Sequence, residues 1–250
     1  QIMTMTYFFL SCLLLLVLSV AHAAPSSQRQ ALGSSTLQPI AFLVRGGDDD
    51  PKQVAEPSSS SLGTYAVLEE SVLFSRWRIL YQRLVRMPNG NVVDFDVVGQ
   101  KGADGAAIIF AWNSQTKTAT LCREYNPGPN KILCGLAAGL IEGDKHSDPK
   151  MAAECELEEE IHLAGGTWHE LTESPLAMDK YATTLIHAFL VIDAQPVANP
   201  RPLDDEEDIE ILTNVSVDEI KSMIRQGEMN VVGSWAALLG LEKLRELGEI

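Results

Sequence analysis

The chain has 250 residues, of which 46% are hydrophobic, and its 34 acidic and 19 basic residues give a formal net charge of −15 at pH 7. A chain of this length and composition can bury one sizeable core or two small ones, which excludes a disordered or fibrous protein. The negative charge repels phosphate backbones and anionic lipids, so it argues against nucleic-acid binding and stable membrane association. A polyanionic small substrate would need bound cations or locally placed arginines.

The N-terminal segment has the pattern of a targeting sequence. An apolar run from Tyr7 to Val20 is followed by Ala21-His22-Ala23, the small-x-small pattern that signal peptidase cuts after, so residues 1–23 are predicted to be a signal peptide. Residues 24–47 contain two arginines and no acid, a composition that resembles an organelle transit peptide. The combination resembles the two-part plastid targeting of algae with complex plastids, with ordinary secretion as the alternative.

The cysteines favour a reducing final compartment. Removal of the signal peptide leaves Cys122, Cys134 and Cys155, an odd number without C-x-x-C spacing. Such a set is a poor disulfide framework for a secreted protein. We therefore expect entry into the secretory route, followed by a compartment in which thiols stay reduced.

Predicted strands open the folded domain. Residues up to 62 complete the transit-like segment and linker, and the domain is expected to span residues 63–250. Apolar-rich runs at 76–86 and 91–98 flank an Asn-Gly pair, which is a strong hairpin signal. Residues 106–112 and 118–125 repeat this pattern around a polar turn at 113–115.

A helix rich in glutamate follows. Ser147-Asp148-Pro149 predicts its start and Ala164-Gly165-Gly166 its end. Glu156, Glu159 and Glu160 fall on one helix face, where they repel one another and meet the negative end of the helix dipole. A bound Mg²⁺, or Mn²⁺ as an alternative, would remove both penalties. Taken alone, the pattern is more simply interpreted as a solvated acidic surface.

The segment from Leu136 to Glu142, followed by this helix, resembles a Nudix box, G-x5-E-x7-R-E-U-x-E-E-x-G-U with U aliphatic, of the form found in ADP-ribose and ADP-sugar pyrophosphatases. Gly139 matches the first glycine, and residues 156–160 match the E-U-x-E-E core, so the box spans 139–163. The resemblance implies a magnesium site built from Glu156, Glu159 and Glu160, with Ala138 as a further ligand.

The box departs from the family pattern at several positions. Two additional residues lie between Gly139 and Glu156, so the middle glutamate of the motif has only Glu142 and Asp144 as candidates. Cys155 stands where the motif has arginine, and His162 stands where it has its final glycine. These departures favour the alternative of a non-catalytic nucleotide-binding module.

The resemblance extends to both sides of the box. Residues 121–127 resemble the strand and turn that precede the box in ADP-ribose pyrophosphatases, which implies that Arg123 and Glu124 bind substrate. Residues 202–210 resemble the acidic loop from which those enzymes supply a further glutamate. That loop implies a catalytic base at Glu207, with Glu206 as the alternative.

The implied fold is α/β, a Nudix α/β/α sandwich with a mixed sheet, preceded by a small β-rich portion at 63–100 that helps to build a homodimer in relatives. The implied reaction is Mg²⁺-dependent hydrolysis of a nucleoside diphosphate-linked substrate, ADP-ribose or an ADP-sugar, to AMP and a sugar phosphate. Another Nudix substrate class, such as nucleoside triphosphates, dinucleoside polyphosphates or coenzyme A, is a further alternative.

Overall fold

The computed structural model describes residues 59–60, 63–103, 105–203 and 207–250. The predicted signal peptide and the transit-like segment at 24–47 lie outside these residues, as does Glu206. All described residues belong to one compact unit, Val54–Ile250. Among the helices that the structure describes, none combines the length and the apolar character needed to cross a bilayer.

The N-terminal portion is a three-stranded antiparallel sheet of β3 (Ala66–Ser75), β4 (Arg78–Arg86) and β5 (Val92–Gln100), preceded by the short pair β1 (Ser59–Ser60) and β2 (Gly63–Thr64). Gly90 adopts a left-handed φ of 85° in the β4–β5 turn, so the predicted Asn-Gly hairpin is confirmed. The sequence did not predict β3, because two register shifts interrupt its alternation. The homodimer implied for this portion stays a prediction.

The main sheet has eight strands and follows the order β11-β13-β6-β7-β15, with β12 on β13, β8 on β7 and β9 on β6. Only the β6–β13 pair is parallel, so the sheet is mixed, as predicted. A separate pair joins β10 (Leu163–Ala164) to β14 (Gln195–Pro196). The strands of the main sheet are β6 (Gly105–Asn113), β7 (Thr118–Asn126), β8 (Lys131–Gly135), β9 (Ala137–Ile141), β11 (Thr167–Glu170), β12 (Leu176–Ala177), β13 (Leu185–Ile192) and β15 (Glu210–Val215).

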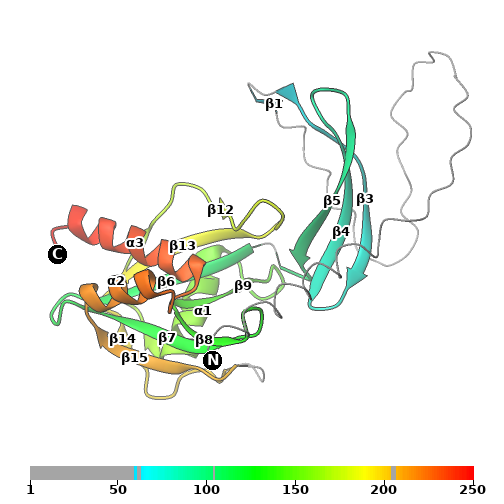
Figure 1. Ribbon diagram of the computed structural model, residues 1–250. Helices are drawn as coiled ribbons and strands as arrows, with labels where there is room; N and C mark the ends of the chain where they lie inside the picture. The colour runs from blue at the N-terminus through cyan, green and yellow to red at the C-terminus, as the bar shows by residue number, and fades with distance from the viewer. Residues whose placement is uncertain (1–58, 61–62, 104, 204–206) are drawn as a thin grey trace, which may run out of the picture. The chain divides into compact units, whose positions relative to one another are not determined.

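Helices cover both faces of this sheet (Figure 1). The helix α1 (Pro149–Ile161) packs on one face, and α2 (Val217–Gln226) and α3 (Val231–Glu246) pack on the other. The predicted α/β sandwich is therefore confirmed.

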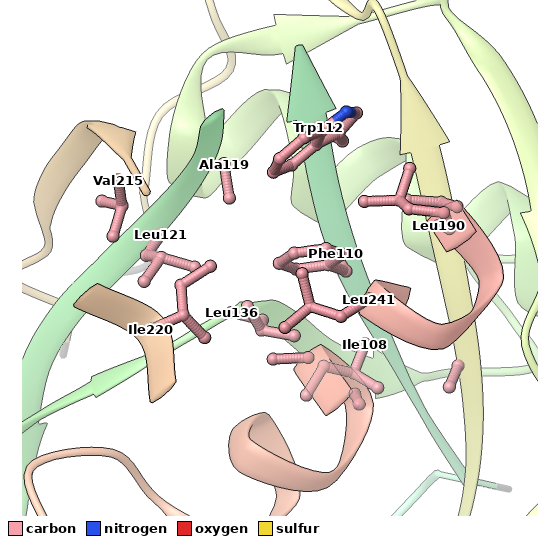
Figure 2. Packing of buried hydrophobic residues seen from close by; sticks show 14 of the residues in the cluster. Ile108, Phe110, Trp112, Ala119, Leu121, Leu136, Leu190, Val215, Ile220 and Leu241 are labelled. Carbon is pink, nitrogen blue, oxygen red and sulfur yellow. The ribbon is translucent and has the colours of Figure 1, made fainter. Parts of the chain in front are cut away.

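The strand β6 shows why the core has two halves. Its side chains alternate between the faces of the sheet, and nearly all are buried, which is typical of a central strand covered on both sides. Ile108, Phe110 and Trp112 contribute to the cluster under α2 and α3 (Figure 2). Ala107 and Ile109 contribute to the cluster under α1, where Leu157 and Ile161 are also buried. Each large apolar side chain buried in this way contributes about 1.5–3 kcal/mol.

The helix α1 begins as predicted and ends earlier than predicted. Asp148 is its N-cap and accepts a hydrogen bond from the Met151 N–H at 2.9 Å, and Pro149 takes the first helical position. The helix ends at Ile161, before the expected stop at 164–166, because His162 adopts left-handed backbone angles (φ 57°, ψ 35°). This conformation normally favours glycine, so His162 stands at a strained cap.

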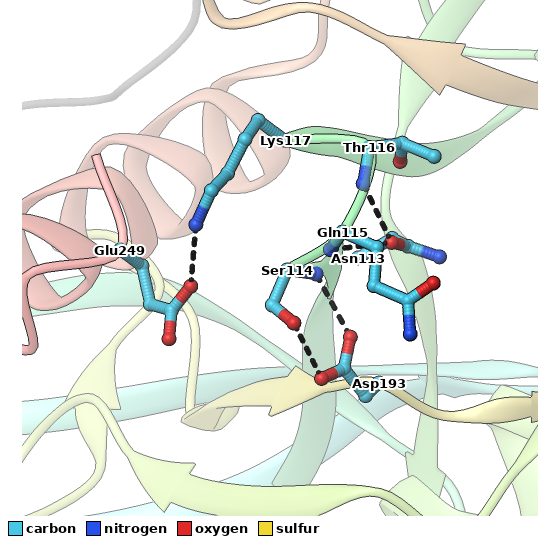
Figure 3. A network of polar contacts seen from close by, with 7 residues as sticks. All are labelled: Asn113, Ser114, Gln115, Thr116, Lys117, Asp193 and Glu249. Carbon is cyan, nitrogen blue, oxygen red and sulfur yellow. Dashed lines mark hydrogen bonds and ion pairs between the residues drawn. The ribbon is translucent and has the colours of Figure 1, made fainter.

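A polar network fixes the predicted turn between β6 and β7 against the end of β13 (Figure 3). The Asp193 carboxylate accepts hydrogen bonds from the Ser114 N–H at 2.8 Å and from the Ser114 hydroxyl at 2.6 Å. Both groups lower the pKa of Asp193, the hydroxyl more than the N–H, because they stabilise the ionised form. Lys117, at the end of the turn, forms an ion pair with Glu249 at 2.9 Å.

Candidate functional site

Glu160 is the buried centre of the glutamate-rich helix. Its side chain is only 5% exposed, and its carboxylate accepts a hydrogen bond from the Ala138 N–H of β9 at 2.9 Å. Ala138, which the resemblance implies as a metal ligand, thus holds this carboxylate through its amide. Burial is the largest cause that raises the pKa of Glu160 to about 9, followed by the negative charge of Glu156.

Glu156 lies against the backbone of β9, one residue further along. An ideal Cβ built on Gly139 would stand 1.9 Å from Glu156 Oε1 and 2.2 Å from its Cδ. Only a residue without a side chain leaves room for this carboxylate. The first glycine of the predicted box therefore has a steric role: it allows α1 and β9 to pack closely with Glu156 between them.

Two further carboxylates approach from other parts of the chain. Glu207, in the segment before β15, and Glu124, on β7, both raise the pKa of Glu160 through their negative charge. Glu124 is half-buried, and burial also raises its own pKa. The structure therefore brings Glu124, Glu156, Glu160 and Glu207 together from three separate segments.

The chemistry of this cluster fits a hard divalent cation, because carboxylate oxygens are the donors that Mg²⁺ and Mn²⁺ prefer and one of them is buried among like charges. The side chains do not form a finished cage: within the described part of the chain, no group of three or more His, Cys, Asp or Glu residues is arranged to hold a metal ion. Metal binding by Glu156, Glu159 and Glu160 stays a prediction.

Glu159 lies beside an arginine that the sequence analysis missed. Arg201 Nη1 is 3.5 Å from Glu159 Oε1, and Arg201 Nε is 3.5 Å from Glu158 Oε2. The same Nη1 donates a hydrogen bond to Cys155 Sγ at 2.7 Å. Glu158 is therefore in contact with Arg201 and is not simply solvated. No local pattern identifies Arg201, because it follows β14 and lies 42 positions beyond Glu159.

Arg123 and Glu124 separate onto opposite faces of the sheet, as neighbours on a strand must. Glu124 shares the α1 side with Cys122. Arg123 forms an ion pair with Glu210 at 3.0 Å, directly across the β7–β15 ladder. Substrate binding by Arg123 and Glu124 stays a prediction. Of the two, only Glu124 belongs to the carboxylate cluster.

The candidates for the middle glutamate of the box lie in the loop between β9 and α1. Glu142 forms an ion pair with Lys145, and its N–H donates a hydrogen bond to His146 Nδ1 at 3.2 Å. Asp144 is exposed in the same loop. The chain turns here, because the Lys145 and His146 N–H groups both donate hydrogen bonds to the Glu142 carbonyl. The charges that raise the pKa of Glu160 are those of Glu156, Glu207 and Glu124 rather than those of the two candidates.

No protein-family model matches the chain. The chain is 24% identical over 163 residues to an ADP-ribose pyrophosphatase of Bacillus subtilis (strain 168), an alignment that covers 64% of this chain and 83% of that protein. Its structure is similar to the crystal structure of an ADP compounds hydrolase, with a TM-score of 0.62 and 19% identity, covering 77% of this chain and 100% of the other. These similarities confirm the predicted fold and support a Nudix-like relationship.

Proposed function

We propose that this protein is a pyrophosphohydrolase that cleaves the diphosphate bond of ADP-ribose or an ADP-sugar, with Mg²⁺ as its cofactor, to give AMP and a sugar phosphate. The sequence similarity to an ADP-ribose pyrophosphatase and the structural similarity to an ADP compounds hydrolase support the reaction class. The carboxylate cluster around the buried Glu160 carries the proposal, because carboxylate oxygens are the donors that Mg²⁺ prefers and those of this cluster come from three separate segments.

The residues that would hold the cation are Glu156, Glu159 and Glu160. When bound, Mg²⁺ supplies positive charge that offsets the negative oxygens of a diphosphate and positions it for attack. The Ala138 amide fixes Glu160, and Gly139 leaves space for Glu156, so β9 orients two of the three carboxylates.

In hydrolysis, a water oxygen forms a bond to one phosphorus, and the bond between that phosphorus and the bridging oxygen breaks. The attacking water loses a proton, and a carboxylate must accept it. We assign this role to Glu207, which the resemblance to the acidic loop of ADP-ribose pyrophosphatases implies and whose charge reaches Glu160. Its neighbour Glu206 is the alternative.

The test is a hydrolysis assay that compares ADP-ribose and ADP-glucose with ATP, a dinucleoside polyphosphate and coenzyme A. The nucleotide products, AMP from the ADP-sugars and adenosine bisphosphate from coenzyme A, are followed by chromatography with Mg²⁺, with Mn²⁺ and with excess chelator. Glu160→Gln and Glu207→Gln should each lower the rate at least about tenfold, the scale expected for a lost charge-stabilising or basic group. Glu154→Gln is the matched control, since Glu154 lies on the same helix but is exposed and paired with Lys150.

A non-catalytic nucleotide-binding module is the second candidate, and the departures at Cys155 and His162 favour it. It predicts calorimetric binding of ADP-ribose with no AMP release at any Mg²⁺ concentration. AMP release that disappears with chelator excludes it. Hydrolysis of ATP or coenzyme A, with none of the ADP-sugars, would instead reassign the substrate class.

A further inference from the structure

The last two turns of α1 lack an internal cation. The helix carries five glutamates between positions 154 and 160, and no basic residue in its last turn. An internal ion pair joins Lys150 to Glu154 near its start. Negative charge near a helix C-terminus is unfavourable, so the carboxylates there need a cation from elsewhere in the fold.

Arg201 supplies that cation. Cys155, Glu158 and Glu159 occupy positions i, i+3 and i+4 and therefore share one helix face. Arg201 contacts all three from the connection between β14 and β15. Its Nη1 donates a hydrogen bond to Cys155 Sγ, and its guanidinium lies 3.5 Å from a carboxylate oxygen of each glutamate. The small Cys155 side chain leaves space for the guanidinium over this face.

We propose that Arg201 is a positioning residue that holds Glu159 on the face of α1 that carries Glu156 and Glu160. Its guanidinium lies over Cys155, in space that a longer side chain at position 155 would fill. Glu158 restrains the guanidinium from the second side, so its planar fork is fixed by three groups.

The arginine is half exposed, and its two carboxylate contacts are long, so we expect little effect on stability. Its role in positioning Glu159 predicts an effect on turnover instead. Arg201→Ala should lower kcat by about 10- to 100-fold, as for a catalytic group displaced by a fraction of an ångström to an ångström. KM should change by less than about threefold, because substrate contacts remain.

Three variants separate positioning from a structural role. Arg201→Lys keeps the positive charge but not the planar guanidinium, so its kcat should lie between those of Arg201→Ala and the wild type. Cys155→Arg alone puts a second guanidinium on the same face and should lower kcat. The double variant Cys155→Arg with Arg201→Ala should exceed the Arg201→Ala rate, because the arginine is then supplied from α1 itself. Lys150→Ala, which removes a cation from the start of the same helix, should behave as wild type.

Added guanidinium ion should restore part of the turnover of Arg201→Ala, a response that a folding defect would not show. The inference is overturned if Arg201→Ala retains the turnover of Lys150→Ala, or if the double variant is no faster than Arg201→Ala. These kinetic tests rest on the proposed hydrolysis. An inactive wild-type protein would refute that function, and calorimetric titration of Mn²⁺ then decides: weaker Mn²⁺ binding by Arg201→Ala than by Lys150→Ala supports the positioning of Glu159, and equal binding overturns it.

Discussion

Gly139→Ala tests whether the close packing of β9 on α1 positions Glu156. The added Cβ would stand 1.9 Å from Glu156 Oε1, whereas ordinary contact begins near 3.4 Å, so the carboxylate must retreat by about 1.5 Å, the difference between the two. A displacement of about 1 Å can cost about 100-fold in rate. We therefore expect kcat to fall at least about 100-fold, which corresponds to about 2.7 kcal/mol in the activation barrier.

Stability should change much less than the rate. The obstructing atoms are the far end of a flexible side chain, and Gly139 has no left-handed φ that alanine would resist. Replacing glycine also reduces the freedom of the unfolded chain, which offsets part of the strain. The free energy of unfolding, measured by urea denaturation, should therefore change by less than about 1 kcal/mol.

The assay pairs AMP release from ADP-ribose with calorimetric titration of Mn²⁺, and the matched control is Gly128→Ala. Gly128 lies in the turn between β7 and β8, and a Cβ there would meet nothing within 4 Å. The control should retain both activity and metal affinity, whereas Gly139→Ala should lose both. Unchanged turnover and Mn²⁺ affinity in a folded Gly139→Ala protein would show that the position of Glu156 does not matter.

Two further predictions concern stability. Asp193→Asn, which keeps a residue type that tolerates the left-handed φ of 59°, should lower the free energy of unfolding by about 1 kcal/mol at pH 7, because the Ser114 N–H and hydroxyl lose a charged acceptor at a partly solvated position. The folded-state pKa of Asp193 is lowered, so this contribution is present above the unfolded pKa of about 3.9 and is lost as pH falls through the folded pKa. If the wild-type protein remained more stable than the variant at a pH below both pKa values, the reasoning would be contradicted. His162→Gly should raise stability by about 0.5–1 kcal/mol, since glycine accepts the left-handed C-cap without strain, and a lower melting temperature would show that the His162 side chain has a stabilising role of its own.

The sequence by itself determined the features that depend on short-range pattern. The apolar run at 106–112 identifies the strand β6, the Asn-Gly pair identifies the β4–β5 turn, and Asp148-Pro149 identifies the start of α1. Each depends on backbone conformation or side-chain period within a few residues, so neighbouring letters suffice. The helix spacing that places Glu156 and Glu160 near each other is also a short-range pattern.

Only the tertiary structure decided which charges meet. Sheet pairing and helix packing bring Glu124 and Glu207 toward Glu160 and direct Arg123 to Glu210 instead. The same packing brings Arg201 to Cys155, although 46 positions separate them in sequence. Coulomb and hydrogen-bond energies depend on distances of a few ångströms, and distances between remote segments follow from the whole fold rather than from local sequence. The glutamates could therefore be predicted from their spacing, whereas the arginine that holds them could not.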